Sequence, residues 1–409
     1  MEYFSNFITE QKNTHMTHIE DKVIYGGVNG TRQAIMALRM LRDMLGGSHD
    51  GTVSVKWDGA PAVFCGIDPT DGKFFVAKKG IFNKNPKVYK TAAEVESDTS
   101  GDLATKLKEA LKYLPELGIK GVIQGDFLFS SEDVGNEIID GQRYLTFHPN
   151  TIVYAVPYES EAAKTIRKAK IGIVWHTTYN GNSFESMSAS YGVDISKFNK
   201  SSNVWSQDAM LRDLTNATMS KQDTEIVNEL LTQAGKLFNQ ISGSTLRELE
   251  ANGELAQHIE TYNNSFVRSG TIVTDTRAHA DGLIKWIHDK YQKEIDARKT
   301  PAGKSAVSKK RQDFLDFFSQ ENKASLIKMF DLQKVIVLAK LKLINTLNKL
   351  QTIGTFVKNR NGFKVTGAEG YVAIDKLGGD AIKIVDRMEF SFNNFSPDIL
   401  KGWDKLGKR

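Results

Sequence analysis

A lysine and an aspartate stand close together in the apolar stretch 53–64, which reads VSVKWDGAPAVF. β-Branched and apolar residues flank a Lys-x-Asp-Gly turn, a pattern that predicts two strands meeting at this turn. Burial of a lysine is costly and can lower its pKa until the amine becomes a nitrogen nucleophile. Lys56 is therefore a candidate nucleophile, Asp58 places a carboxylate nearby, and Gly59 allows close approach of backbone or ligand. The alternative is a strand end whose lysine reaches solvent.

Three later apolar runs each carry a single charged side chain that could work with Lys56. Residues 122–129 (VIQGDFLF) contain Asp126, residues 368–374 (AEGYVAI) contain Glu369, and residues 381–385 (AIKIV) contain Lys383. Each run predicts a strand. Carboxylates are the hard oxygen ligands that Mg²⁺ or Mn²⁺ prefers, so Asp126 and Glu369 are candidate metal ligands.

The order of these four motifs resembles that of the covalent nucleotidyltransferase superfamily, which includes ATP-dependent DNA and RNA ligases and mRNA capping enzymes. In that superfamily Lys-x-Asp-Gly precedes an acid-bearing strand, Glu-Gly-hydrophobic-Val and a lysine-bearing strand, as it does here. The resemblance covers roughly residues 50–180 and 350–390. It implies an α+β fold with a ligase-type nucleotidyltransferase core of antiparallel sheets. It also implies a polynucleotide ligase that uses ATP to form a lysyl-AMP and seals 5′-phosphate to 3′-hydroxyl ends.

The resemblance assigns a role to each motif residue. Lys56 would attack the α-phosphate of ATP, and Lys383 would contact that phosphate. Glu369 and Asp126 would hold Mg²⁺ or Mn²⁺, with ribose binding as the alternative for Asp126. Asp58 would orient the lysine or a metal-bound water.

Further nucleotide contacts are expected from the same resemblance. A basic residue before a glycine points to Lys79, with Lys78 as second choice. An aromatic ring on a strand after the Asp126 strand would stack on the base, and the candidates are Phe147, Tyr154 and Trp175. Packing in the core is the alternative for each ring.

Three departures from the superfamily pattern support other functions. Pro61 occupies a position that is often Arg or Asn, Asp126 replaces the usual Glu, and the last motif has one lysine where many members have two. One alternative is a non-catalytic nucleic-acid-binding protein with a degenerate ligase fold. Another is a nucleotidyltransferase whose acceptor is a protein or small molecule.

The pattern of elements divides the chain into four parts. Residues 1–50 form an N-terminal helical segment, residues 51–185 and 351–409 form the two parts of the core, and residues 186–350 form an inserted α-helical basic domain. The tail leaves no room for the OB-fold domain usual in DNA ligases and capping enzymes. The layout is therefore closest to an RNA-ligase-like protein such as those of phages, and we expect RNA rather than DNA as acceptor.

The second half of the insertion is strongly basic. Residues 285–349 contain 15 Lys and Arg against 7 Asp and Glu, and residues 301–311 (PAGKSAVSKKR) resemble a mobile basic loop. Neutralising phosphates releases counterions, so Lys304, Lys309, Lys310 and Arg311 are candidate nucleic-acid contacts. The alternative is a solvated basic helical face.

Composition sets broader limits on the class of protein. The 409 residues carry a net charge of +5, compatible with a polyanionic partner such as RNA or DNA ends. The single cysteine, Cys65, cannot form an internal disulfide. No apolar run of membrane-spanning length and no secretory signal is present, so we expect a cytoplasmic protein (in the host cytoplasm if it is viral) without a membrane partner. The polar cluster His15, His18, Glu20 and Asp21 is expected to be a solvated helix start.

Overall fold

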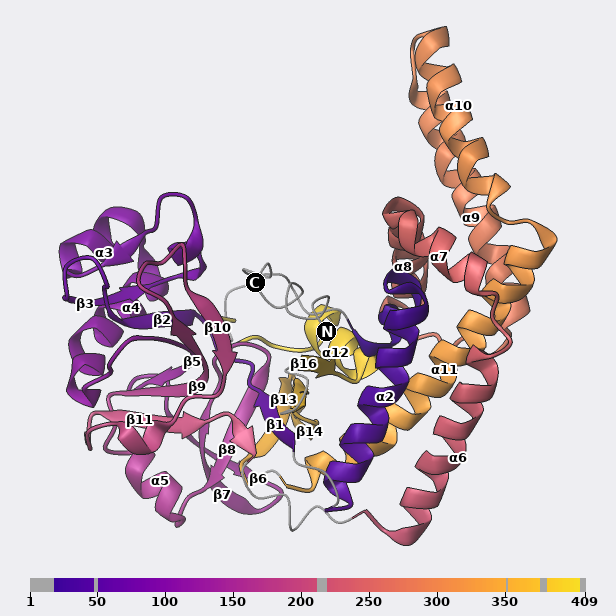
Figure 1. The fold of residues 1–409 in the computed structure, drawn as a ribbon. Coiled ribbons are helices and arrows are strands. Elements are labelled where there is room, and N and C mark those ends of the chain that lie inside the picture. Colours follow the sequence, from indigo (N-terminus) through magenta and orange to yellow (C-terminus); the bar gives the residue numbers. More distant parts are fainter. Residues whose placement is uncertain (1–17, 48–50, 212–218, 351, 376–380, 405–409) are drawn as a thin grey trace.

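Two lobes, one built from sheets and one from helices, face each other across the strands that carry the lysine motifs (Figure 1). This computed structural model describes residues 18–47, 51–211, 219–350, 352–375 and 381–404. The expected α+β class is confirmed, with several antiparallel sheets. None of the helices in these ranges is long and apolar enough to cross a membrane.

The strands form three sheets, and nearly all of the pairings are antiparallel. The lysine sheet has the order β12-β1-β15-β16 and contains Met210–Leu211, Gly51–Lys56, Gly370–Asp375 and Ala381–Ile384. The seven-stranded sheet has the order β10-β9-β5-β2-β3-β4, with β11 added in parallel to β9; these strands are Ser188–Tyr191, Ile171–Asn180, Val122–Ser130, Ala62–Ile67, Phe74–Ala77, Val88–Tyr89 and Val204–Asp208. The five-stranded sheet has the order β14-β13-β8-β7-β6 and contains Gly362–Val365, Gly354–Asn359, Ile152–Pro157, Gln142–Phe147 and Gly135–Ile139.

Strand β1 and the turn that follows it connect these sheets. β1 lies in the middle of the lysine sheet, and after residues 57–61 the chain enters β2 of the seven-stranded sheet. The Lys-x-Asp-Gly turn therefore crosses from one sheet to another, rather than closing a simple hairpin. The short helices of this lobe are α3 (Ala92–Asp98), α4 (Gly101–Tyr113) and α5 (Glu161–Ile166).

The helical lobe is assembled from segments that are far apart in the chain. Its long helices are α6 (Lys221–Phe238), α7 (Gly243–Ala251), α8 (Gly253–Arg268), α9 (Thr276–Ala297), α10 (Pro301–Asp316) and α11 (Gln320–Asn348). Helix α2 (Gly27–Leu45), preceded by α1 (Lys22–Tyr25), packs against α6, α7 and α11. Because α11 buries residues along most of its circumference, it behaves as the central helix of this lobe. The N-terminal segment thus completes the same apolar core as the insertion.

Two expectations about the insertion are corrected. Residues 301–311 are not a loop: they form the first part of α10, because Thr300 caps the helix by accepting from Gly303 N–H and Pro301 occupies the first turn. Val307 and Phe314 anchor this helix with buried side chains. The helical character also starts later than residue 186, since β10, β11 and β12 lie between residues 188 and 211.

A buried ionic cluster joins the N-terminal segment to helices α11 and α12. Lys340 of α11 donates to both carboxylate oxygens of Glu20 at 2.7 and 2.9 Å, and Arg387 of α12 (Arg387–Phe395) donates to both oxygens of Asp21 at 3.0 Å. Glu20 and Asp21 are buried, so the expected solvated helix start is wrong there; His15 lies outside the described residues. His18, next to this cluster, forms a backbone bridge with Lys383.

Candidate active site at the junction of three sheets

The pairing of β1 with β15 brings the first and third motifs together. Lys56, the last residue of β1, lies opposite Gly370, and the Lys56 ammonium forms an ion pair with the Glu369 carboxylate. The Lys56 side chain is 35% exposed and the Glu369 side chain 11% exposed, so the pair stands at the edge of the protein interior. A Cβ on Gly370 would lie 2.5 Å from a methyl group of Val385, which explains the need for glycine after Glu369.

Glu369 is poised to change its charge near neutral pH. Burial raises the pKa of the Glu369 carboxyl from 4.5 to about 7, the Lys56 ammonium acts in the opposite direction, and the nearby carboxylates of Asp58 and Asp126 add to the rise. A carboxyl with a pKa close to ambient pH is suited to accepting or donating a proton.

Lys383 faces the same side of the lysine sheet as Lys56. Val372 of β15 lies opposite both Ser54 of β1 and Lys383 of β16, so the three side chains share a face. Lys56 follows Ser54 by two residues and therefore points to that face too. Burial lowers the pKa of the Lys383 ammonium, and the positive charge of Lys56 lowers it further. Two lysines on one half-buried face form a cationic surface that suits a phosphate.

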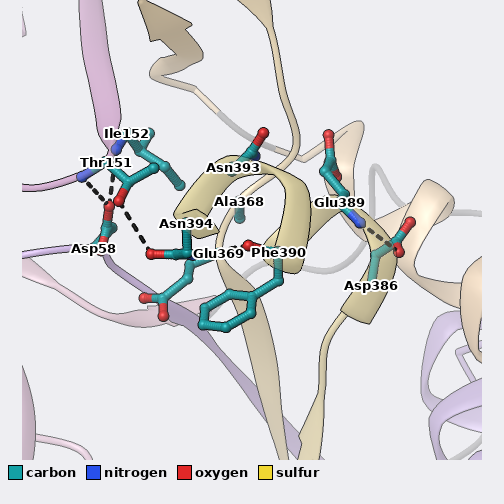
Figure 2. Close-up of a pocket in the computed structure, with 10 residues that line it drawn as sticks. All are labelled: Asp58, Thr151, Ile152, Ala368, Glu369, Asp386, Glu389, Phe390, Asn393 and Asn394. Atoms are coloured by element: carbon teal, nitrogen blue, oxygen red, sulfur yellow. Dashed lines mark hydrogen bonds between the residues drawn. The ribbon is translucent and has the colours of Figure 1, made fainter. Parts of the chain in front are cut away.

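Asp58 ties the turn to the five-stranded sheet. One of its oxygens accepts from the backbone N–H groups of Thr151 and Ile152 at 2.7 and 2.8 Å (Figure 2). The other accepts from the Asn150 amide at 2.6 Å. The Asp58 N–H donates to the Tyr154 hydroxyl at 2.6 Å. These hydrogen bonds show that Asp58 positions the Lys56 turn. Asp58 also lines the pocket, so its direct role with the lysine or a metal-bound water stays a prediction.

Gly59 and Asp126 lie where the turn passes over β5. A Cβ on Gly59 would come within 2.6 Å of the Asp126 Cβ and 2.9 Å of the Phe127 carbonyl oxygen, so only glycine fits between the two motifs. Hydrogen bonds from Ala60 N–H to Phe127 O and from Phe127 N–H to Pro61 O, both 2.9 Å, fix this approach. Pro61, a departure from the superfamily pattern, thus accepts a backbone hydrogen bond from the Asp126 strand.

His176 lies beside Asp126 and was not among the candidate site residues of the sequence analysis. A register shift between β5 and β9 pairs Gln124 with Thr177 and Gly125 with Trp175, which leaves His176 as the extra residue of a β-bulge. Its Nε2 lies 3.7 Å from Asp126 Oδ2, and its Nδ1 lies 2.7 Å from the Thr177 hydroxyl. A bulge depends on the pairing of distant strands, so no local signal in the sequence reveals it.

Helix α12 closes one side of the site, and sequence reasoning missed it as well. A pocket with about 270 Å³ of empty space, including its open mouth, lies between this helix, Asp58 and Glu369. Figure 2 shows Phe390, Asn393 and Asn394 of α12 on its wall, with the Thr151 hydroxyl donating to Asn394 at 3.1 Å. The enclosed part of this pocket is only about 10 Å³, room for about one water molecule, so a nucleotide would have to lie in the exposed space beside Lys56.

The expected base-stacking rings do not have a free face. Phe147 and Tyr154 stack on each other with ring centroids 5.4 Å apart, and both are buried; Trp175 is fully buried and donates to the Ser206 hydroxyl at 3.1 Å. The prediction that one of them stacks on a base is corrected, because core packing uses all three rings.

The other residues predicted to bind nucleotide or nucleic acid do not contact Lys56 or Glu369. Lys79 is exposed at the start of a short 3₁₀ helix after β3, and Lys78 pairs with Asp98 at 3.0 Å. The basic residues of the insertion lie on α10, which extends with α9 beyond the other helices of the helical lobe (Figure 1). There Lys310 pairs with Glu254 at 2.6 Å and Arg311 donates to Gln292 at 2.6 Å, whereas Lys304 and Lys309 are exposed.

The carboxylates near Lys56 fit only one mode of magnesium binding. In the described ranges, no group of three or more His, Cys, Asp or Glu side chains is arranged to hold a metal ion. Mg²⁺ usually keeps several waters and is held by one or two carboxylates together with substrate phosphates. Asp126 and Glu369 suit that mode, whereas both oxygens of Asp58 already accept hydrogen bonds from residues 150–152.

Comparison with known proteins gives one match. The model of DUF6267, described as a family of unknown function, matches residues 13–398. No curated protein and no solved structure matches the chain.

Proposed function

We propose that this chain, which belongs to the DUF6267 family, is an ATP-dependent nucleic-acid ligase of the covalent nucleotidyltransferase type, with RNA favoured over DNA. The observation that carries the proposal is the lysine sheet. Its pairings place Lys56, Glu369 and Lys383, from three separate motifs, together around one half-buried face. Asp126 comes next to the same turn through the contact of Gly59 with β5.

In the first step the Lys56 amine would attack the α-phosphorus of ATP. A bond forms between the amine nitrogen and phosphorus, the bond from phosphorus to the bridging oxygen breaks, and pyrophosphate leaves with that electron pair. The Lys56 ammonium must first lose a proton, and the Glu369 carboxylate is its ion-pair partner. A carboxyl whose pKa lies at about 7 can hold that proton at neutral pH.

Lys383 and a bound metal ion would stabilise the negative charge on the phosphates. The Lys383 ammonium, on the same face as Lys56, would stabilise the negative charge that develops on the α-phosphate. Asp126 would hold Mg²⁺ or Mn²⁺, which would supply further charge neutralisation at the phosphates, whereas Glu369 could join it as a ligand only when it does not hold the Lys56 proton. AMP would then pass from Lys56 to a 5′-phosphate, and a 3′-hydroxyl would displace it to seal the strand.

The test is transfer of label from [α-³²P]ATP to the protein in the presence of Mg²⁺ or Mn²⁺, with GTP in parallel. We expect label from ATP that survives denaturing electrophoresis and disappears in Lys56→Ala and Lys56→Arg. Lys358→Ala is the matched control, because Lys358 is also a strand lysine paired with a glutamate, Glu137, at 3.2 Å. Absence of label from folded wild-type protein with either nucleotide would refute the proposal.

A second candidate function is binding of nucleic acid without catalysis, and the exposed Lys304 and Lys309 on the projecting helix α10 favour it. This function predicts salt-sensitive binding that is unchanged in Lys56→Ala. A third outcome, label on Lys56 without joining of RNA or DNA ends, would identify a nucleotidyltransferase with a different acceptor.

A further inference from the structure

Asp126 and His176 are separated by a gap whose width fits a shared metal ion. Nε2 of His176 lies 3.7 Å from Oδ2 of Asp126, which is longer than a direct hydrogen bond of about 2.7–3.2 Å. Two ligand atoms that each lie about 2.1 Å from one ion, at angles of about 90–120°, are about 3.0–3.6 Å apart. The observed distance is therefore close to the one that a bound ion would span.

The β-bulge in β9 presents the imidazole on the same face of the sheet as the carboxylate. Asp126 of β5 lies opposite Val174 of β9, and His176 follows Val174 by two residues. Gly125 allows the two strands to approach here, because a Cβ at Gly125 would lie 2.4 Å from the Val174 carbonyl oxygen. The bulge thus brings a nitrogen ligand within reach of a carboxylate on the neighbouring strand.

Both side chains are accessible and suitably prepared for an ion. The side chains of His176 and Asp126 are 27% and 21% exposed, and no hydrogen bond from the described residues occupies the Asp126 carboxylate. Nδ1 of His176 lies 2.7 Å from the Thr177 hydroxyl, which accepts a hydrogen bond when Nδ1 carries the proton. That tautomer leaves the Nε2 lone pair for a metal ion. A hydrogen bond at the other ring nitrogen is the usual way in which a metal-binding histidine is oriented.

The pair lies next to the Lys-x-Asp-Gly turn. Gly59, three residues after Lys56, would place a Cβ 2.6 Å from the Asp126 Cβ. The Asp126 carboxylate is also close enough to Glu369 to raise the pKa of that carboxyl. An ion held by Asp126 and His176 would therefore lie beside the Lys56–Glu369 ion pair, where the proposed reaction requires phosphates.

The two ligand types determine which kind of ion is preferred. Imidazole nitrogen is a ligand of first-row transition metals, whereas Mg²⁺ and Ca²⁺ take oxygen ligands. Mn²⁺ shares the preference of Mg²⁺ for carboxylate oxygens and, as a first-row transition ion, also binds imidazole. One imidazole beside one carboxylate therefore favours Mn²⁺ over Mg²⁺.

We propose that Asp126 and His176 together form a binding site for Mn²⁺, with His176 as a metal ligand and water or phosphate oxygens in the remaining positions. Thr177 orients the imidazole from its other ring nitrogen. The inference rests on the proposed function only for the use of the ion, which would neutralise phosphate charge beside Lys56. Binding of the ion itself requires neither ATP nor catalysis.

The test is a titration of Mn²⁺ into protein without a histidine tag and without nucleotide, followed by electron paramagnetic resonance (EPR) of the free ion. We expect His176→Gln and Asp126→Asn each to raise the Kd for Mn²⁺ at least about tenfold. His288→Gln is the matched control and should leave Kd unchanged. His288 also lies beside an aspartate, Asp289, at 3.2 Å, but that carboxylate pairs with Lys285 on the surface of α9. Circular dichroism verifies the fold of each variant.

Pulsed EPR of the Mn²⁺ complex identifies the nitrogen ligand directly. Coupling of the electron spin to a bound ¹⁴N nucleus should be present in the wild type and in His288→Gln, and absent in His176→Gln. Mg²⁺ should displace Mn²⁺ from His176→Gln at a lower Mg²⁺ to Mn²⁺ ratio than from the wild type, because only oxygen ligands remain there. Thr177→Val keeps the shape of the side chain but loses the hydroxyl, and it should weaken Mn²⁺ binding by about 10- to 100-fold.

The proposal is overturned if the wild type shows no nitrogen coupling, or if the wild type and His176→Gln bind Mn²⁺ with equal Kd. Because the titration contains no nucleotide, its outcome is separate from that of the proposed function. Label on Lys56 together with equal Kd in His176→Gln refutes the metal site alone. Nitrogen-coupled Mn²⁺ in a protein that takes up no label refutes the ligase proposal and leaves the metal site standing.

Discussion

Replacement of Glu369 by glutamine tests two effects of the buried carboxylate: its destabilisation of the folded protein and its role as proton acceptor for Lys56. Burial raises the pKa of this carboxyl from 4.5 to about 7. Between these two values the unfolded chain has lost the proton while the folded protein keeps it, so the folded state binds more protons and stability falls as pH rises. The difference of about 2.5 pKa units corresponds to about 3 kcal/mol.

The glutamine variant lacks this titration. We therefore expect the free energy of unfolding of Glu369→Gln, measured relative to that of the wild type, to increase by about 3 kcal/mol between about pH 4.5 and about pH 8, because only the wild type loses stability over this range. Urea unfolding followed by circular dichroism at both pH values measures this difference. Glu137→Gln is the control, because Glu137 is a strand glutamate that pairs with Lys358 where its side chain is 38% exposed. The stability of Glu137→Gln relative to the wild type should change by less than about 1 kcal/mol between the two pH values.

The same variant tests the proposed chemistry. Loss of a proton acceptor typically slows a reaction by about 10²–10⁴-fold, so labelling of Lys56 should slow by that range in Glu369→Gln. In the wild type the rate should rise with pH through about 7, as the carboxyl loses its proton. If the stability difference is the same at both pH values, the carboxyl is not controlled by burial, and the reasoning that gives it this role is refuted.

Three further predictions concern the scaffold and the basic helix. Asp58→Ala should lower the free energy of unfolding by about 3 kcal/mol or more in urea titrations, because it leaves several buried donors without an acceptor; a change below about 1 kcal/mol would contradict the scaffold role. Lys340→Met should cost about 3–5 kcal/mol by leaving a buried carboxylate, and addition of Glu20→Leu should restore most of it in a double-mutant cycle. Lys304→Glu with Lys309→Glu should reduce the slope of log K against log salt for nucleic-acid binding, and an unchanged slope would exclude α10 from the interface.

The strands that carry the motifs could be predicted from the sequence because their signal is local. Lys56, Asp126, Glu369 and Lys383 each interrupt an apolar run of strand length, and the structure places each of these runs in a sheet. The α+β class follows from the same alternation of short apolar runs and long helical patterns.

The roles that failed depend on partners distant in the chain. The role of Asp58 as acceptor for donors at residues 150–152 cannot be predicted from its own motif. Phe147 and Tyr154 were plausible stacking rings, but burial is decided by neighbours that a strand pattern cannot reveal. Gly and Ser near the start of α10 favour a loop over a helix in a sequence-based prediction. Thr300 and Pro301, however, are the cap and first-turn residues typical of a helix start.

The pairing of β1 with β15 determines when the site can exist during synthesis. Lys56 leaves the ribosome early, yet its partner strand begins at residue 370, after the seven-stranded sheet and the whole helical insertion have been translated. Contacts between such distant residues form late, because a long loop must close first. A nascent or prematurely released chain that lacks β15 would hold Lys56 without Glu369 and Lys383, so we expect nucleotide chemistry to begin only after residue 385 has been made.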